Sequence, residues 1–501
     1  MTEAARDTVI RGGRVLDVSS GTAPEIDFLI VNGSIADMGP PGLAAPAEAL
    51  VLEATDRLLI PGLVNAHTHS HGALGRGAVG DRILLEQFLA AASGINGART
   101  LEDKYLSAKL SAVEMVRRGC TACYDMSVEL PAPTAEGLHA VGQAYRDTGM
   151  RAVVAPMMAD LTVYQAIPGL LDALPAEHRA LVADLRAAPA ATSLAACQAA
   201  LRTWPFDRAL VRPGIAPTIP LHCSDEFLVG CHTLAKDFDV PLQTHLGETR
   251  TQAVAGRQRY GRSLTAHLSS LGLLDSLFSA AHGIWLDDQD MHLLAEAGVA
   301  GVSHNPMSNL RVGSGVAAVR RMISAGLTVG IGTDASNTSD GQNMFEAIRL
   351  CAYLSRIMDV DPDRWLSAEE VLSAATVGSA AILGMDWVGR LAPGWAADIV
   401  FLDLAEPHFV PLRHALRQMV FGENGASVRR VMIAGRTIVA DGRVLTVDEA
   451  ALRRQAESAA ERLALANEPA RELFGLVVGH VGCFCLGLMR QPLDMARRID
   501  A

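Results

Sequence analysis

Charged residues are scarce in this chain, and positive ones are in the minority. They make up 20% of the 501 residues, and 43 lysines and arginines against 55 aspartates and glutamates leave a formal net charge of −12. An acidic chain repels polyanions, so we expect no nucleic-acid partner. Half of the residues are hydrophobic, which excludes disorder and allows a large core. At this length we expect one large domain and a smaller one.

The chain also lacks a secretory pattern and a disulfide framework. Its first residues, MTEAARDTVIRGG, include no apolar segment, so we expect a cytoplasmic protein. Its eight cysteines are scattered, which fits a reducing compartment. Cys120 and Cys123 form a CxxC without a second one, and Cys483 and Cys485 form a CxC. We interpret these as buried thiols rather than zinc ligands.

Long hydrophobic runs are few. The most apolar stretch, residues 473–489, is short for a membrane span and is interrupted by His480 and four glycines. We therefore expect a docked C-terminal helix or strand and no membrane partner. It belongs to a C-terminal helical extension, residues 448–501, whose function the sequence does not indicate.

Both ends of the chain have β-rich segments. In residues 1–61, apolar and polar residues alternate with a period of two and are interrupted by Gly, Asn and Pro. Residues 389–447 have a similar pattern. Two such segments at opposite ends predict one small β-sandwich domain built from both.

Between them, residues 62–388 alternate strand-like and helix-like segments. A typical helix covers residues 100–119, with a capping box of Thr100 and Asp103 and a glycine stop. No glycine-rich phosphate loop follows an early strand, which disfavours a doubly wound open sheet. The pattern predicts an α/β fold, a (β/α)8 TIM barrel with a helical insertion at about 161–205. The expected strands are residues 62–67, 121–126, 151–160, 211–217, 240–245, 278–283, 298–304 and 327–334.

The segment NAHTHSH, residues 65–71, has three histidines in seven residues. Residues two apart on a strand share a face, so His67 and His69 present two imidazoles side by side. His71 has the same parity, but Gly72 follows it and the strand should have ended. We therefore expect His71 at the rim or behind the ligands.

A lone HxH is weak evidence, but other expected strands end on ligand-type residues. His245, His282 and Asp334 close three of them. The carboxyl ends of barrel strands meet at one face, so this placement predicts a metal site. Nitrogen and carboxylate ligands without thiolate suit zinc first and iron(II) second, with manganese and cobalt also compatible.

Glu248 follows His245 by three residues, where the strand gives way to a loop. A lone loop glutamate is more often a solvated residue or a helix N-terminal charge. Beside a ligand histidine at a barrel mouth, we interpret it as a proton carrier between a metal-activated water and a leaving group.

These motifs resemble the amidohydrolase superfamily, in particular its cytosine-deaminase-like and triazine hydrolase group. The resemblance covers roughly residues 8–447 and is highly specific as an ordered set. It is carried by PGLVNAHTH, THLGET, AHGIWL, SHNPMSNLRVGSG, GIGTDASNTSDGQNMFEAIRL, GRLAPGWAADIVFLD and VMIAGRTIV.

The resemblance implies one divalent metal, with Asp334 and His282 also acting on the water and the reaction intermediate, and Glu248 as proton shuttle. It implies no carboxylated lysine, because APMMAD offers none. His304 would face the pocket, and the candidate substrate-binding residues are His304, Asn309 of the same motif, Thr218 and His71. The group's habit also implies a homodimer or larger assembly. The implied metal ligands are His67, His69, His245 and Asp334.

Two departures concern the substrate. Relatives acting on adenosine-like compounds show PHAPYTCS, whereas this chain has PTIPLHCSDE with Thr218 in place of the histidine, which argues against a nucleoside. The segment SHGALGRGAVGDRILLEQFL lacks the usual DDLPLxEWL, so we expect a different pocket wall.

We therefore expect a metal-dependent hydrolase with a small-molecule substrate. The first hypothesis is a hydrolytic deaminase that releases ammonia or an amine from an amino-substituted nitrogen heterocycle: a purine, pyrimidine, pterin or triazine. The alternative is hydrolysis of an amide or urea C–N bond by the same groups. From another class, a catalytically silent metal-binding scaffold has no need of a proton carrier such as Glu248.

Overall fold

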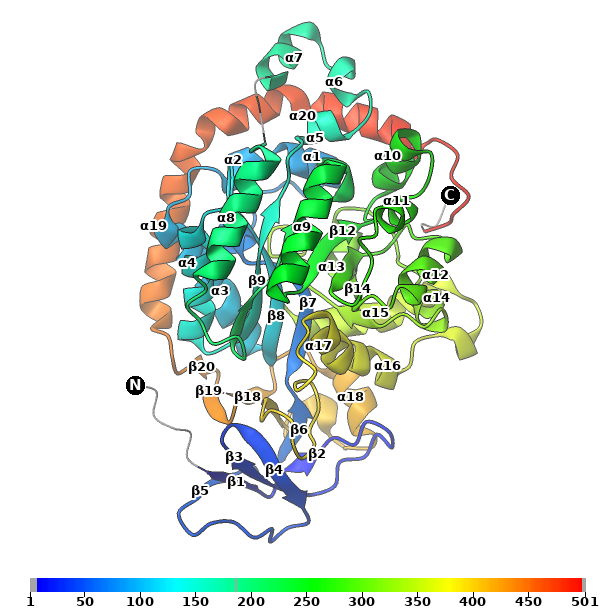
Figure 1. The fold of residues 1–501 in the computed structure, drawn as a ribbon. Helices are drawn as coiled ribbons and strands as arrows, with labels where there is room; N and C mark the ends of the chain where they lie inside the picture. Colours follow the sequence, from blue (N-terminus) through cyan, green and yellow to red (C-terminus); the bar gives the residue numbers. More distant parts are fainter. Residues whose placement is uncertain (1–6, 184, 186, 498–501) are drawn as a thin grey trace.

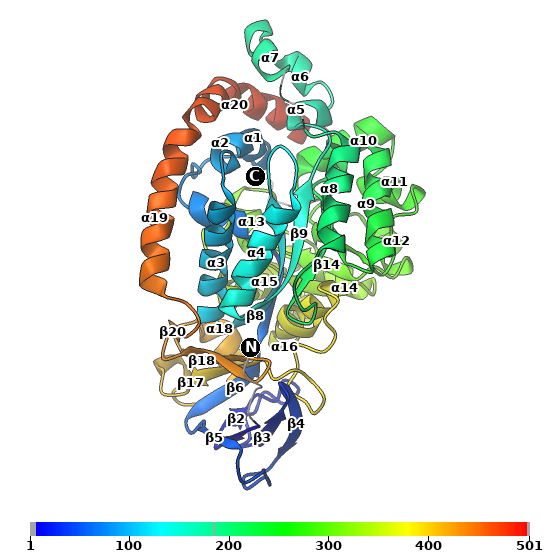
Figure 2. The ribbon, with the colours of Figure 1, turned by 60° about the vertical axis from the view of Figure 1, so that its left-hand side comes forward.

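The computed structural model describes residues 7–183, 185 and 187–497 (Figures 1 and 2). Its central region is built from parallel strands in two sheets. One has the order β10-β9-β8-β7-β16, with β11 also on β9, and the other has the order β12-β13-β14-β15. The strands are β7 Leu63–His69, β8 Cys120–Val128, β9 Arg151–Met158, β10 Val211–Pro213, β11 Ala216–Pro217, β12 Leu242–Leu246, β13 Phe278–His282, β14 Gly301–His304, β15 Val329–Ile331 and β16 Asp334–Ala335.

The two parallel sheets adjoin at both edges. At one edge, Ile215 forms a parallel bridge with Leu242 at the start of β12. At the other, β16 follows β15 after two residues and pairs with β7, where Asp334 lies opposite Thr68. The expected strand positions are confirmed, except that residues 211–217 and 327–334 each form two short strands.

Helices follow the strands and cover the sheets (Figure 1). The expected capping box is confirmed: Asp103 N donates to Thr100 Oγ1 at 3.2 Å, and Thr100 N donates back to Asp103 Oδ2 at 2.8 Å. The helices up to residue 422 are η1 Ser70–Gly75, α1 Leu85–Ala90, α2 Ala92–Asn96, α3 Leu101–Arg117, α4 Ala135–Thr148, α5 Val163–Ala166, α6 Leu170–Ala173, α7 Ala176–Ala183, α8 Ala190–Arg202, η2 Pro220–His222, α9 Asp225–Phe238, α10 Arg250–Tyr260, α11 Leu264–Ser270, α12 Asp288–Glu296, α13 Pro306–Arg311, α14 Val319–Ser324, α15 Met344–Met358, η3 Pro362–Arg364, α16 Ala368–Ser373, η4 Ala374–Gly378, α17 Ser379–Ile382, η5 Pro407–Phe409 and α18 Ala415–Gly422.

Among its described residues, the expected insertion, residues 161–205, contains helices joined by short turns and loops. It contributes α5 to α8, and residues 184 and 186 lie outside the described residues. Buried apolar side chains of α5 and α6 pack with those of the C-terminal helix α20, Glu468–Met489, in one cluster. Helices α5, α6 and α7 therefore lie at the same end of the molecule as α20, whereas α8 packs along the side against α4 and α9 (Figure 1).

The two chain ends meet in two further sheets. One has the order β4-β3-β1-β5, and the other has the order β2-β6-β17-β18-β19-β20. Antiparallel pairing of β6 with β17 joins residues 57–61 to residues 399–403. Phe28, Ile30 and Phe401 belong to one buried cluster that the sheets share. The strands are β1 Thr8–Arg11, β2 Arg14–Val15, β3 Asp27–Val31, β4 Ser34–Gly39, β5 Leu50–Glu53, β6 Arg57–Pro61, β17 Ile399–Asp403, β18 Val428–Ile433, β19 Arg436–Ala440 and β20 Arg443–Val444.

The C-terminal extension is two consecutive helices, α19 Glu449–Ala466 and α20 Glu468–Met489. Figure 2 shows α19 alongside α3, and α20 crosses the end of the molecule over α1, α2 and α10. The apolar stretch 473–489 lies within α20, which has 22 residues and includes an 18-residue part with a mean hydropathy of 1.8, so this helix is long and apolar enough to cross a membrane by length and composition. Length and composition alone are weak evidence of a membrane span, since core helices pass the same test. The expected absence of a membrane partner stays a prediction.

Candidate metal centre and active site

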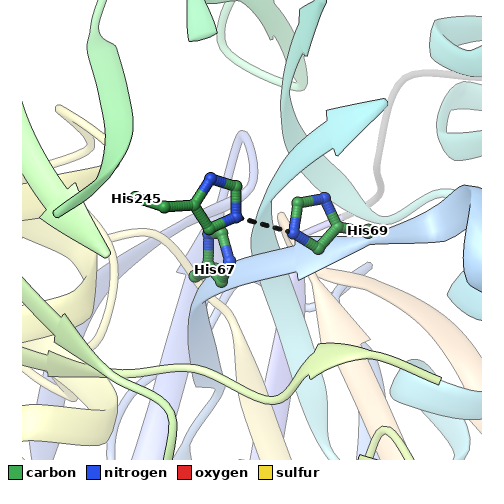
Figure 3. A group of neighbouring side chains, drawn as sticks. All are labelled: His67, His69 and His245. Carbon is green, nitrogen blue, oxygen red and sulfur yellow. Dashed lines mark hydrogen bonds between the residues drawn. The ribbon is translucent and has the colours of Figure 1, made fainter. Parts of the chain in front are cut away.

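Four histidines and one aspartate meet at the ends of β7, β12 and β13 and the start of β16. His67 and His69 project from the same face of β7, as the two-residue period requires, and their ring centroids lie 4.7 Å apart. His245 is on β12 and stacks against His69 at 5.2 Å (Figure 3). His282 ends β13, and Asp334 begins β16. All five side chains are buried.

The Nδ1 atoms of the histidines face acceptors behind them. His67 Nδ1 lies 2.7 Å from Gln243 Oε1, and His69 Nδ1 lies 2.7 Å from Met126 O. His245 Nδ1 donates to Thr218 O at 2.5 Å. An acceptor at Nδ1 holds the proton there and leaves the Nε2 lone pair free, which is the arrangement found behind metal-binding histidines.

The free Nε2 atoms converge. His69 Nε2 and His245 Nε2 lie 3.1 Å apart (Figure 3). Because both protons are held on Nδ1, these two lone pairs repel unless a cation lies between them. Nitrogens that share a tetrahedral metal at ~2.1 Å lie roughly 3.4 Å apart, close to the observed spacing. His67 Nε2 is buried and has no hydrogen-bond partner among the described residues, as expected of a ligand atom.

Asp334 completes the donor set. Its Oδ1 lies 3.6 Å from His67 Nε2 and 3.2 Å from His69 Nε2, and its Oδ2 accepts a hydrogen bond from Ser308 Oγ at 2.5 Å. Burial raises the pKa of Asp334, but the neighbouring His67 and His69 hold it well below its usual range. The site therefore offers imidazole nitrogens and one ionised carboxylate, which fits a divalent metal such as zinc or iron.

His282 and Asp334 both have a backbone conformation that is unusual for residues other than glycine. Their φ angles are 73° and 60°, in the left-handed region that costs a residue other than glycine roughly 1–3 kcal/mol. Such strain persists where the surrounding structure enforces it, and it gathers at functional sites. His282 Nδ1 donates to Asn309 Oδ1 at 2.9 Å, and burial lowers the pKa of His282 to about 3. Its imidazole is therefore neutral.

Glu248 lies in the loop between β12 and α10, where the sequence places it. Its Oε1 is 3.6 Å from His282 Nε2, and the side chain is only 3% exposed. Burial, together with the negative charges of Asp334 and Glu86, raises the pKa of Glu248 well above its ordinary value. A carboxyl group with a raised pKa beside a metal centre is suited to accept and return a proton.

The residues expected to bind substrate lie at different places. The carbonyl of Thr218 positions His245, and the Oδ1 of Asn309 positions His282; Asn309 Nδ2 is buried and has no partner among residues 7–183, 185 and 187–497. His71 is outside the strand, in η1, as expected, with its ring centroid 5.3 Å from that of His69. His304 ends β14 and is buried; its Nδ1 has no partner within the described part of the chain, and burial lowers its pKa to about 4. The small cavity that it lines is formed with residues 317–321 and 351–364 rather than with the metal-site histidines.

Sequence reasoning missed several supporting side chains. Gln243 is two residues before His245 on β12, so strand parity alone places it on the same face. Ser308 and Asn305 lie in the SHNPMSN motif, but their contacts depend on how that loop folds. Gln252, one turn into α10, accepts a hydrogen bond from Glu248 N at 3.0 Å.

Fold and site together define a metal-dependent hydrolase of the α/β class. The model of the amidohydrolase family matches residues 58–438, which is most of the chain. The chain belongs to the amidohydrolase family, and the resemblance expected from its motifs is confirmed. Its relatives indicate a hydrolase acting on carbon–nitrogen bonds of small molecules.

Two curated relatives are deaminases. The 5-methylthioadenosine/S-adenosylhomocysteine deaminase of Syntrophobacter fumaroxidans is 34% identical over 84% of this chain and 89% of its own length. The 5'-deoxyadenosine deaminase of Methanothermobacter thermautotrophicus is 32% identical over 91% of this chain and 98% of its own.

Two solved structures share the fold and contain zinc. An adenosine deaminase from Xanthomonas campestris with bound zinc has a TM-score of 0.79 at 27% identity, covering 91% of this chain and 98% of its own. An atrazine chlorohydrolase from Arthrobacter aurescens complexed with zinc has a TM-score of 0.80 at 25% identity, covering 90% of this chain and all of its own.

Proposed function

We propose that this chain is a hydrolytic deaminase that releases ammonia from an amino-substituted nitrogen heterocycle, with purine nucleosides as the first substrate class. The observation that carries the proposal is the buried carboxyl group of Glu248, 3.6 Å from His282 Nε2 beside a converged group of histidine lone pairs. Loss of an amine needs a proton donor at the leaving nitrogen, and Glu248 is placed to be one.

The chain's own residues divide the work. His67, His69, His245 and Asp334 would hold one divalent metal, which when bound supplies Lewis acidity and makes water nucleophilic near neutral pH. Glu248 accepts a proton from the attacking water and delivers it to the departing nitrogen, so the carboxylate is regenerated in each cycle. His282 is neutral and its Nδ1–H is held by Asn309, so its Nε2 lone pair can accept a hydrogen bond from the hydroxyl group that adds to the ring carbon.

The purine preference rests on the relatives. Both curated deaminases above are named for adenosine derivatives, which favours a nucleoside although Thr218 replaces the histidine of the adenosine-type motif. The carbonyl of Thr218 is occupied by His245, so the replacement changes the side chain but not the support of the ligand. Pyrimidines, pterins and triazines are the other candidates.

We also propose that the two parallel sheets form one closed (β/α)8 barrel within residues 62–388. The Ile215–Leu242 bridge and the pairing of β16 with β7 support this closure. The shared buried cluster supports a β-sandwich domain of residues 1–61 and 389–447. Residues 448–501 would be a helical extension; residues 1–6 and 498–501 lie outside the described residues.

Zinc is our proposed metal, since zinc is bound in both structural neighbours described above. A cytoplasmic location and a homo-oligomer are also proposed, the latter supported by the apolar residues Leu476 and Leu486 exposed on α20. Metal analysis of the purified protein and its mass in solution test these points.

The deciding experiment measures ammonia release and metal content together. We expect one metal per chain and ammonia from at least one amino-purine, with an oxo-heterocycle as product; a carboxylate or carbamate product would instead establish the amide or urea hydrolase.

Glu248→Gln keeps the shape but removes the proton carrier, so turnover should fall about 100- to 10,000-fold. The control variant is Glu226→Gln, at an exposed position of α9, and it should not change turnover. Near-normal turnover of Glu248→Gln with metal retained would refute the mechanism.

A further inference from the structure

Helix α20 crosses one end of the molecule and exposes one side along its length (Figure 1). From Glu472 onward its exposed residues recur every three or four positions, which places them on one side of the helix. His480 is also exposed but lies at the edge of this side, where its ring centroid is 5.3 Å from that of His178 on α7. We define the outer face of α20 as Glu472, Gly475, Leu476, Gly479, Cys483, Leu486, Gly487 and the C-cap residue Arg490.

The outer face is apolar and uncovered. An 18-residue part of α20 has a mean hydropathy of 1.8, but only 28% of that part is buried. Leu476 and Leu486 are 50% and 41% exposed. A Cβ added at Gly475, Gly479 or Gly487 would meet no described atom within 4 Å, so another backbone can approach this side closely. A contiguous apolar surface of this kind marks contact with another molecule.

The apolar surface continues beside the helix. Residues of the outer face form one wall of a groove of about 490 Å³, and residues 81–84 and 310–313 form the other. Leu310 in this second wall is 44% exposed. The surface available to a partner is therefore wider than one helix, as a stable protein–protein interface requires.

The order of residues along the outer face matches its own reverse. Counted outward from residue 481, the pairs at two, five, six and nine residues are Gly479 and Cys483, Leu476 and Leu486, Gly475 and Gly487, and Glu472 and Arg490. The three inner pairs match in size or in kind. The outermost pair is opposite in charge, which is the match that a charged pair needs.

This order fits two antiparallel copies of the helix. In a two-fold contact, a residue before the centre meets the partner residue that lies equally far after it. Pairing about residue 481 therefore places leucine against leucine and glycine against glycine, with Glu472 opposite Arg490 of the partner subunit at both ends. In a parallel pair, Glu472 would meet Glu472 of the partner subunit, and like charges repel.

A second copy of this chain fits the outer face better than a membrane does. Glu472 and Arg490 form no ion pair with another described residue, so both charges are available to a partner. Helices that lie on membranes are rich in lysine and arginine on their polar side, whereas the outer face ends in one acidic and one basic residue.

We propose that the outer face of α20 is the interface of a two-fold homodimer, in which two α20 helices pack antiparallel about residue 481. The inference does not rest on the deaminase function. It gives the proposed homo-oligomer a defined surface and a defined orientation.

Disulfide cross-linking tests the orientation. In the antiparallel pair, position 479 lies opposite Cys483 of the partner subunit, whereas in a parallel pair it lies opposite its own copy. Gly479→Cys should therefore give a covalent dimer with Cys483 when an oxidant is added, and a reductant should separate it. In Gly479→Cys combined with Cys483→Ser no cross-link should form, and a covalent dimer of that variant would overturn the antiparallel arrangement.

Molar mass in solution tests the charges. Glu472→Arg and Arg490→Glu each replace both ion pairs by like-charge contacts, so each should raise the Kd of the dimer about 10-fold. The double variant restores opposite charges and should restore the Kd. Glu461→Arg makes the same change at an exposed position of α19 and should have no effect. Because the pair covers Cys483, this thiol should react more slowly in the dimer than in the dissociated chain.

The outcomes are independent of ammonia release, so the deaminase function and the interface can fail separately. A covalent dimer through positions 479 and 483, with a Kd that the double charge variant restores, supports the interface. A monomeric wild type, or a dimer that neither single charge variant weakens, overturns it. A monomer that binds vesicles of phosphatidylcholine and phosphatidylserine would overturn it in favour of a membrane contact.

Discussion

Gln243 should control how tightly the chain holds its metal. Its Oε1 lies 2.7 Å from His67 Nδ1, and its side chain is fully buried between β7, β12 and β13. Gln243→Met keeps the length and volume but removes the acceptor. His67 then has a buried Nδ1–H without a partner, or moves its proton to Nε2 and blocks its own lone pair.

The size of the effect follows from the lost hydrogen bond. An unpaired buried donor costs about 1–3 kcal/mol, and removing the group behind a histidine ligand typically weakens metal binding about 10- to 100-fold. Gln243 Nε2 also donates to Ala66 O at 3.1 Å, so some loss of folding stability is expected as well. The metal-free protein must therefore be compared for Tm to separate the two effects.

The assay is a metal titration of metal-free protein with a competing chelator. Gln252→Met is the matched control, because Gln252 contacts Glu248 and no histidine ligand. We expect Gln243→Met to raise the Kd for the metal, with turnover per bound metal largely kept, and Gln252→Met to lower turnover with Kd unchanged. Equal Kd values for wild type and Gln243→Met would refute the idea that Nδ1 acceptors prepare this site.

Two further predictions use the whole chain. Removing the metal with a chelator should lower Tm, and adding zinc should restore it, because a metal at 100 times its Kd adds about 2.7 kcal/mol to the free energy of unfolding. A Tm that does not change when zinc is added would argue against metal binding by the folded state. Of the eight cysteines, only Cys483 is exposed, and burial raises the pKa of Cys120, Cys197 and Cys351 to about 12. One thiol per native monomer should therefore react quickly with a disulfide reagent, and all eight should react after unfolding. Several quickly reacting thiols in the native state would contradict the packing of the core and of α20.

The parts of the site that lie on strands could be predicted, and the parts on loops could not. The two-residue period of a strand places His67 beside His69, and the end of each strand identifies His245, His282 and Asp334. The contacts of Ser308 and Asn309 depend on the loop after β14, whose course has no periodic signal in the sequence.

Local chemistry also explains the strand boundaries that differ. Residues 211–217 were expected as one strand, but Pro213 has no N–H to donate to a neighbouring strand, and Gly214 follows it. A Cβ at Gly214 would lie 2.9 Å from Tyr124 Oη, so the close approach of the chain here requires glycine. At residues 327–334, the positive φ of Asp334 turns the chain away from β14 and onto β7.

The buried nitrogens at this site that have no hydrogen-bond partner among the described residues call for one kind of ligand. His67 Nε2 and His282 Nε2 are both lone pairs that face the proposed metal position, so a cation bound there should stabilise the fold and an anion should not. Zinc should therefore raise the Tm of the metal-free protein, whereas acetate at the same concentration should leave it unchanged. A rise in Tm with acetate alone would contradict the assignment of these nitrogens as ligand lone pairs.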